Sequence, residues 1–122
     1  MRVLLVDDEV EFVSTLAERL AIRGIEATYA TTSAEALSCL ESGDFDVAVL
    51  DVKMPKVGGL TLKKELEARR PGMKFIFLTG YGSEHDFKAI SEHVGTDYYL
   101  VKPVDIDALI AKMEKIIKPE RE

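Results

Sequence analysis

The segment Val47-Ala48-Val49-Leu50-Asp51 places a carboxylate directly after four consecutive apolar residues. An apolar run without polar alternation is typical of a parallel β-strand that is covered on both faces. Similar apolar runs recur at residues 3–6, 75–78 and 98–101. Residues 25–29 alternate between apolar and polar side chains, which predicts a further strand at the edge of the sheet.

Between these strands the apolar residues recur with the period of a helix. The last such segment forms one continuous stripe of Ile106, Leu109, Ile110, Met113, Ile116 and Ile117. The other stripes are Phe12, Val13, Leu16 and Leu20; Ala34, Leu37 and Leu40; Leu62 and Leu66; and Phe87, Ile90 and Val94. Gly24, Gly43 and Gly95 each lead into a strand and predict left-handed helix ends. Five alternations of strand and helix predict an α/β fold, a doubly wound (βα)5 parallel sheet.

The composition limits the classes of function. A chain of 122 residues with 47% hydrophobic and 31% charged residues fits one globular domain. The net charge of -6 argues against direct binding of nucleic acid, and no apolar run is long enough to span a membrane. The first residues meet Asp7 without a cleavage site, and Cys39 is the single cysteine, so we expect neither a signal peptide nor a disulfide. The expected location is the cytoplasm.

Polar residues follow the predicted strands at the point where each strand ends. They are Asp7 and Asp8, Asp51, Thr79 and Lys102. Because parallel strands end at the same edge of a sheet, we expect these side chains to converge. Asp8 alone could be a helix cap, but two carboxylates about 4 Å apart repel by about 4 kcal/mol at an effective dielectric constant near 20. One lysine cannot offset three carboxylates, so the set predicts a Mg²⁺ site with a phosphoryl group facing Lys102 and Thr79.

At this point the chain resembles the receiver domain of two-component response regulators over essentially its whole length. The matching motifs are Asp7-Asp8, Asp51-x-x-Met54-Pro55 followed by Gly58-Gly59, Thr79-Gly80, and Lys102-Pro103. The resemblance implies a flavodoxin-like fold similar to the chemotaxis regulator, with strand order 2-1-3-4-5. It also implies that Asp51 accepts a phosphoryl group from a phosphohistidine on a sensor histidine kinase or a histidine phosphotransferase.

The resemblance further implies the metal ligands. Asp8, Asp51 and the backbone carbonyl of Lys53 are expected to bind Mg²⁺ directly, with Mn²⁺ as a substitute, and Asp7 through a water molecule. Thr79 and Lys102 are expected to hold the phosphoryl oxygens, and Gly80 to leave room beside them.

Three further expectations concern single residues. Tyr99 is expected to be an aromatic switch that turns inward on phosphorylation and reshapes the face formed by the fourth helix, fifth strand and fifth helix. Without the resemblance, Tyr99 would be interpreted as a packed aromatic residue of an edge strand. The Lys102–Pro103 peptide bond is expected to be cis. Lys53 and Tyr81 flank the expected path of attacking water and either guard the phosphoryl group or point to solvent.

The functional prediction is a signalling receiver of residues 1–118 with a tail of residues 119–122, and not an enzyme acting on a separate substrate. Its expected partners are the kinase or phosphotransferase and a target protein or an output domain, and a phosphorylation-dependent homodimer is compatible with the resemblance. One alternative is a Mg²⁺-dependent phosphohydrolase that uses an aspartyl-phosphate, although Lys53 occupies the position where such enzymes carry a second acid. Another is a constitutive interaction domain, although no motif position is missing. Whether the chain is a whole protein or a fragment stays open.

Overall fold

The computed structural model describes residues 1–54, 58–80 and 99–117, and it places five parallel strands in one sheet. The strands are β1 (Arg2–Val6), β2 (Glu26–Ala30), β3 (Val47–Asp51), β4 (Lys74–Thr79) and β5 (Tyr99–Val101). Their order is β2-β1-β3-β4-β5, with every neighbouring pair parallel. Both the predicted fold class and the predicted strand order are therefore confirmed.

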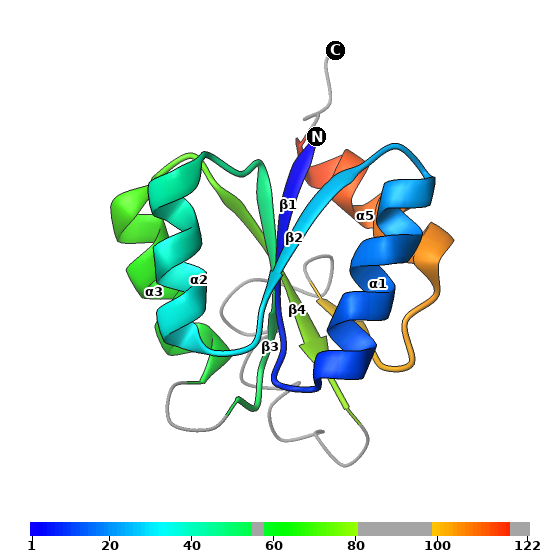
Figure 1. Cartoon of the computed structure of the whole chain (residues 1–122), viewed down its shortest axis with the longest axis horizontal. Helices are drawn as coiled ribbons and strands as arrows, with labels where there is room; N and C mark the ends of the chain where they lie inside the picture. Colours follow the sequence, from blue (N-terminus) through cyan, green and yellow to red (C-terminus); the bar gives the residue numbers. More distant parts are fainter. Residues whose placement is uncertain (55–57, 81–98, 118–122) are drawn as a thin grey trace.

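Helices cover both faces of this sheet (Figure 1). They are α1 (Val10–Ile22), α2 (Ser33–Cys39), which continues into a 3-10 turn (Leu40–Ser42), α3 (Gly59–Arg69) and α5 (Ile106–Ile117). Helices α2 and α3 lie on one face, and α1 and α5 lie on the other. The fourth helix expected around Phe87, Ile90 and Val94 lies outside the described residues. Among the described helices, none has the length and apolar character needed to cross a membrane.

Two apolar cores form because successive residues of each strand point to opposite faces. In β1, Leu4 and Val6 join the core under α2 and α3, while Val3 and Leu5 join the core under α1 and α5. All four side chains are fully buried or nearly so. Burial of each such side chain stabilises the fold by about 1.5–3 kcal/mol, which explains why the strands are apolar without alternation.

The helix stripes pack as their spacing predicts. Leu109 and Met113 form the fully buried centre of the α5 stripe, and Leu62 and Leu66 do the same for α3. The outer residues of the α5 stripe are partly exposed because the stripe is wider than its contact with the sheet. The two cores hold the strands in register and so fix the edge where the strands end.

One glycine prediction is wrong. Gly24 has φ of +83°, the left-handed conformation expected at a helix end. Gly43, in contrast, has φ of 166°, which is extended backbone that any residue adopts. An added Cβ would lie 2.5 Å from the Arg2 guanidinium, but this is the end of a flexible side chain that can move aside, so the position does not require glycine. Gly95 lies outside the described residues.

Candidate functional site

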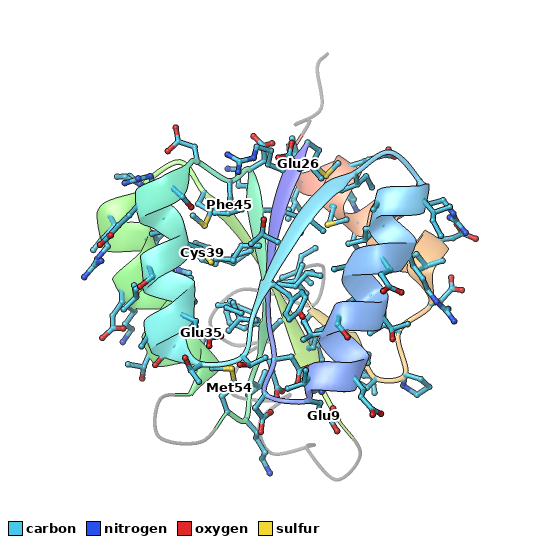
Figure 2. The ribbon with its side chains drawn as sticks, viewed as in Figure 1. Glu9, Glu26, Glu35, Cys39, Phe45 and Met54 are labelled. Carbon is cyan, nitrogen blue, oxygen red and sulfur yellow. The ribbon has the colours of Figure 1, made fainter. Side chains whose placement is uncertain are left out.

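The polar residues predicted to converge do lie at one edge of the sheet. Asp51 and Thr79 are the last residues of β3 and β4, while Asp7 and Lys102 directly follow β1 and β5. This edge lies at the bottom of Figure 2, where the labelled Glu9 follows the end of β1. The parallel sheet thus brings residues from four strand ends to one place.

Three carboxylates form a compact cluster. One oxygen from each of Asp7, Asp8 and Asp51 lies within 4.8 Å of the others. Asp7 and Asp51 are only 1% and 7% exposed, whereas Asp8 is exposed. Three hard oxygen donors with excess negative charge and one solvent-facing member fit a divalent cation such as Mg²⁺. The donor set is therefore chemically suited to the Mg²⁺ ion that the resemblance implies.

The electrostatics of the cluster show the cost of placing these charges together. Burial, followed by the negative charge of Asp7, raises the pKa of Asp51 to about 6, with Lys102 opposing the shift. Burial also raises the pKa of Asp7 above its usual value. The cluster therefore favours anything that brings positive charge to it, whether a proton, a cation or the ammonium of Lys102.

Lys102 supplies one positive charge to the cluster. Its Nζ lies 2.7 Å from Asp7 Oδ2, 2.8 Å from Glu9 Oε1 and 4.0 Å from Asp51 Oδ2. Burial alone would lower the pKa of Lys102, but the bonds to Asp7 and Glu9 outweigh that effect and raise it. The Lys102–Pro103 peptide bond is cis, which is the isomer expected for it.

Backbone hydrogen bonds fix the two buried carboxylates. The Glu9 N–H donates to Asp7 Oδ1 at 2.9 Å, and the Lys53 N–H donates to Asp51 Oδ1 at 3.3 Å. The Lys102 N–H donates to the Thr79 carbonyl at 2.7 Å, which ties the end of β5 to the end of β4. The carboxylates of Asp7 and Asp51 are thus each oriented by a backbone N–H from the loop that directly follows the strand.

An open cavity of about 630 Å³ lies over these groups. Its lining residues are Asp8, Glu9, Phe12, Asp51, Lys53, Gly80, Lys102 and Pro103. Asp51 is therefore reachable from solvent, and among the described residues nothing lies within 4 Å of where a Cβ on Gly80 would be. The cavity beside Asp51 has room for a group of the size of a phosphoryl group.

Two of the predicted site residues are buried and do not line the cavity. Thr79 is 3% exposed, and Tyr99 is 6% exposed and packs in the core that also contains Phe77 and Met54. The Tyr99 side chain is thus buried in this structure, and its turn on phosphorylation stays a prediction. Tyr81 lies outside the described residues.

Two residues of the site were not anticipated from the sequence. Glu9 binds Lys102, and the ring of Phe12 lies 4.7 Å from the same ammonium. The only sequence signal for Glu9 is its position directly after Asp7 and Asp8. No local spacing could reveal Phe12, because its contact with Lys102 joins distant parts of the chain.

Comparison with known proteins agrees with this geometry. Residues 3–114 match the response regulator receiver domain family. The response regulator SaeR of Staphylococcus aureus is 33% identical over 114 residues, which cover 93% of this chain and 49% of SaeR. The chain thus spans about half the length of the curated relatives it matches.

Solved structures give the same result. A response regulator receiver domain protein from Clostridium thermocellum has a TM-score of 0.81 and 32% identity, covering 95% of this chain and 93% of its own. A CheY-like response regulator receiver domain protein from Methanospirillum hungatei has a TM-score of 0.82 and 34% identity, and the match covers 95% of this chain and 92% of that protein's chain. None of these similarities supports the phosphohydrolase alternative. The chain belongs to the response regulator receiver domain family of two-component systems.

Proposed function

We propose that Asp51 accepts a phosphoryl group from a phosphohistidine of a sensor histidine kinase or a histidine phosphotransferase. An Asp51 carboxylate oxygen attacks phosphorus, a P–O bond forms, and the P–N bond breaks with its electron pair moving to the imidazole nitrogen. The observation that carries this proposal is the placement of Asp51 in the open cavity, beside two carboxylates and 4.0 Å from the Lys102 ammonium.

The acid cluster would hold the Mg²⁺ ion, or Mn²⁺ in its place. We assign Asp8, Asp51 and the Lys53 backbone carbonyl as direct ligands, and Asp7 as a ligand through water. A bound cation supplies positive charge that offsets the phosphoryl oxygens and the three carboxylates. This assignment is supported by the short distances within the cluster and by the raised pKa values of Asp7 and Asp51.

Lys102 and Thr79 would then act on the phosphoryl oxygens. The Lys102 ammonium stabilises charge that develops as the phosphoryl group moves, and its flexible stem permits the short movement from Asp7 toward Asp51. The Thr79 hydroxyl donates to a phosphoryl oxygen, and Gly80 leaves the oxygens room. We propose that Tyr99 responds to the movement of Thr79 and changes the surface around β5 and α5.

The proposed role is signalling, and the chain would not act as an enzyme on a separate substrate. Phosphotransfer and dephosphorylation would be catalysed by its own site. The receiver unit would span residues 1–118, with residues 119–122 as a tail. A target protein or an output domain would read the switched surface, either directly or through a phosphorylation-dependent homodimer. A cytoplasmic setting is part of the proposal, in keeping with a single cysteine that has no disulfide partner in the chain.

Incubation with acetyl phosphate tests the proposal. With Mg²⁺, intact mass should increase by one phosphoryl group per chain, and the group should be lost in alkali as expected for an acyl phosphate. A chelator should prevent labelling, because the acid cluster would then repel the anionic donor. Labelling that is independent of metal, or rapid turnover of small phosphate esters, would contradict the proposal.

A further inference from the structure

The start of α1 brings a further carboxylate to Lys102. Glu9 Oε1 lies 2.8 Å from Lys102 Nζ, nearly as close as Asp7 Oδ2 at 2.7 Å. The ring centroid of Phe12 lies 4.7 Å from the same nitrogen. Two carboxylates and an aromatic ring, all from residues 7–12, therefore surround the ammonium.

Asp51 lies outside this group of contacts. Its Oδ2 is 4.0 Å from Lys102 Nζ, beyond the range of about 2.7–3.2 Å for a hydrogen bond from nitrogen. To bind a phosphoryl oxygen on Asp51, the ammonium must turn away from part of its present contacts. In this structure Lys102 thus lies close to the Asp51 carboxylate without a hydrogen bond to it.

The two carboxylates that hold Lys102 differ in one respect. Asp7 belongs to the acid cluster, so a bound cation would offset its charge and weaken its hold on the ammonium. Glu9 is not part of that cluster, and its side chain is 63% exposed. Its contact with Lys102 therefore involves no carboxylate of the acid cluster.

We propose that Glu9 is a positioning residue, which holds Lys102 near Asp7 in the unphosphorylated protein and competes with the phosphoryl group for its ammonium. This inference rests on the proposed phosphorylation of Asp51. Glu9 would not contact the reacting atoms and would act only through Lys102. It sets how readily the receiver enters the phosphorylated state.

Two substitutions at Glu9 separate contact from charge. Glu9→Gln removes the charge and keeps the shape of the side chain. Glu9→Asp keeps the charge but shortens the side chain by one methylene group, so that the carboxylate lies farther from Lys102. Both should react with acetyl phosphate and Mg²⁺ about fivefold faster than wild type, a difference of about 1 kcal/mol in the barrier. Glu11→Gln is the matched control, since it removes an exposed charge from the first turn of α1, and among the described residues Glu11 forms no ion pair with Lys102. Its rate should stay within about twofold of wild type because exposed charges are screened.

A second measurement needs no phosphorylation. In the metal-free protein, ¹⁵N NMR of the lysine ammonium groups reports how fast the Lys102 protons exchange with water, and Lys102→Arg identifies the signal. Carboxylates that bind the ammonium slow this exchange. Both Glu9 variants should exchange at least about fivefold faster than wild type and Glu11→Gln, because one of two close partners is lost.

The outcomes are distinct. If Glu9→Asp behaves as wild type while Glu9→Gln is faster, the effect is one of charge alone and the inference is wrong. Unchanged or slower phosphorylation in both Glu9 variants, with a normally labelled wild type, overturns this inference but leaves the proposed function intact. A wild type that takes up no phosphoryl group overturns the proposed function, and this inference with it.

Discussion

Lys102 Nζ lies 4.0 Å from Asp51 Oδ2, close enough for electrostatic attraction but too far for a hydrogen bond. The ammonium is instead bonded to carboxylates at the start of the chain. The acid cluster and the Lys102 ammonium therefore lie together at this site, while the ammonium is not hydrogen-bonded to Asp51. The acid cluster and the Lys102 ammonium have consequences for stability and for reactivity.

The raised pKa of Asp51 predicts how stability depends on pH without metal. The pKa is about 6 in the folded protein and 3.8 in the ordinary reference state, so the folded state binds more protons between these values. The free energy of unfolding should therefore fall as pH rises from about 4 to 6, by about 1–2 kcal/mol after allowance for partial solvation, and then level off. Urea unfolding at several pH values, with a chelator present, measures this change.

Asp51→Asn removes one of the two carboxylates whose pKa is raised and should reduce the slope of that part of the pH profile, with Asp7 accounting for the slope that is left. It should also raise stability at pH 7.5 in the absence of metal, because a buried charge is lost. Glu18→Gln, a change at an exposed carboxylate on α1, should leave the profile unchanged. A wild-type profile with the same slope as that of Asp51→Asn would show that Asp51 is not the group responsible.

Gly59 permits the close approach of α3 to the strand that carries Asp51. A Cβ at Gly59 would lie 2.7 Å from the Asp51 carbonyl oxygen and 3.0 Å from Val52 Cα, both backbone atoms. Gly59→Ala should therefore force a backbone shift, reduce stability by about 1–3 kcal/mol and slow labelling of Asp51. Chemical denaturation and the acetyl phosphate reaction measure the two effects.

Gly72→Ala is the control for this substitution. A Cβ at Gly72 would have nothing within 4 Å among the described residues, and the residue is exposed. Its stability and labelling should match wild type. Equal behaviour of the Gly59 and Gly72 variants would mean that the approach of α3 to β3 does not require glycine.

Much of the fold could be predicted because apolar runs, helix stripes and strand ends are local features of the sequence. The runs that end at Asp51 and Thr79 also fixed which residues meet at the sheet edge, since parallel strands place their ends together. The order of the strands came from the resemblance to receiver domains. Local pattern alone leaves several orders compatible with right-handed crossovers.

Contacts between distant side chains could not be predicted. Glu9 and Lys102 are 93 residues apart, and their contact depends on the conformation of two loops. The Arg2 guanidinium lies beside Gly43, although the two residues are far apart in the sequence. In the sequence Gly59 stands out only as part of a motif, because its steric role depends on the packing of α3 against β3.

Lys53 and Tyr81 bear on the lifetime of the phosphorylated state. Lys53 is exposed and lines the cavity that contains Asp51, whereas Tyr81 lies outside the described residues. If these side chains restrict the approach of water in line with the P–O bond, wild-type phosphate should outlast that of Lys53→Asn/Tyr81→Ala by about tenfold, or about 1.4 kcal/mol. Dephosphorylation after removal of the donor, at fixed Mg²⁺, measures the rates.

Lys64→Asn is the charge control for this double variant, because Lys64 is an exposed lysine on α3 that does not line the cavity. Its phosphorylated form should decay at the wild-type rate. Equal decay of wild type and the double variant would show that neither side chain guards the phosphoryl group.

The central claim is that Asp51 is the phosphoryl acceptor, and intact mass of wild type and Asp51→Asn after treatment with acetyl phosphate and Mg²⁺ tests it most directly. The substitution keeps the shape of the side chain and removes the nucleophilic carboxylate. The account predicts one phosphoryl group on wild type and none on Asp51→Asn, with both proteins folded by circular dichroism. Labelling of Asp51→Asn with the same stoichiometry as wild type would contradict it.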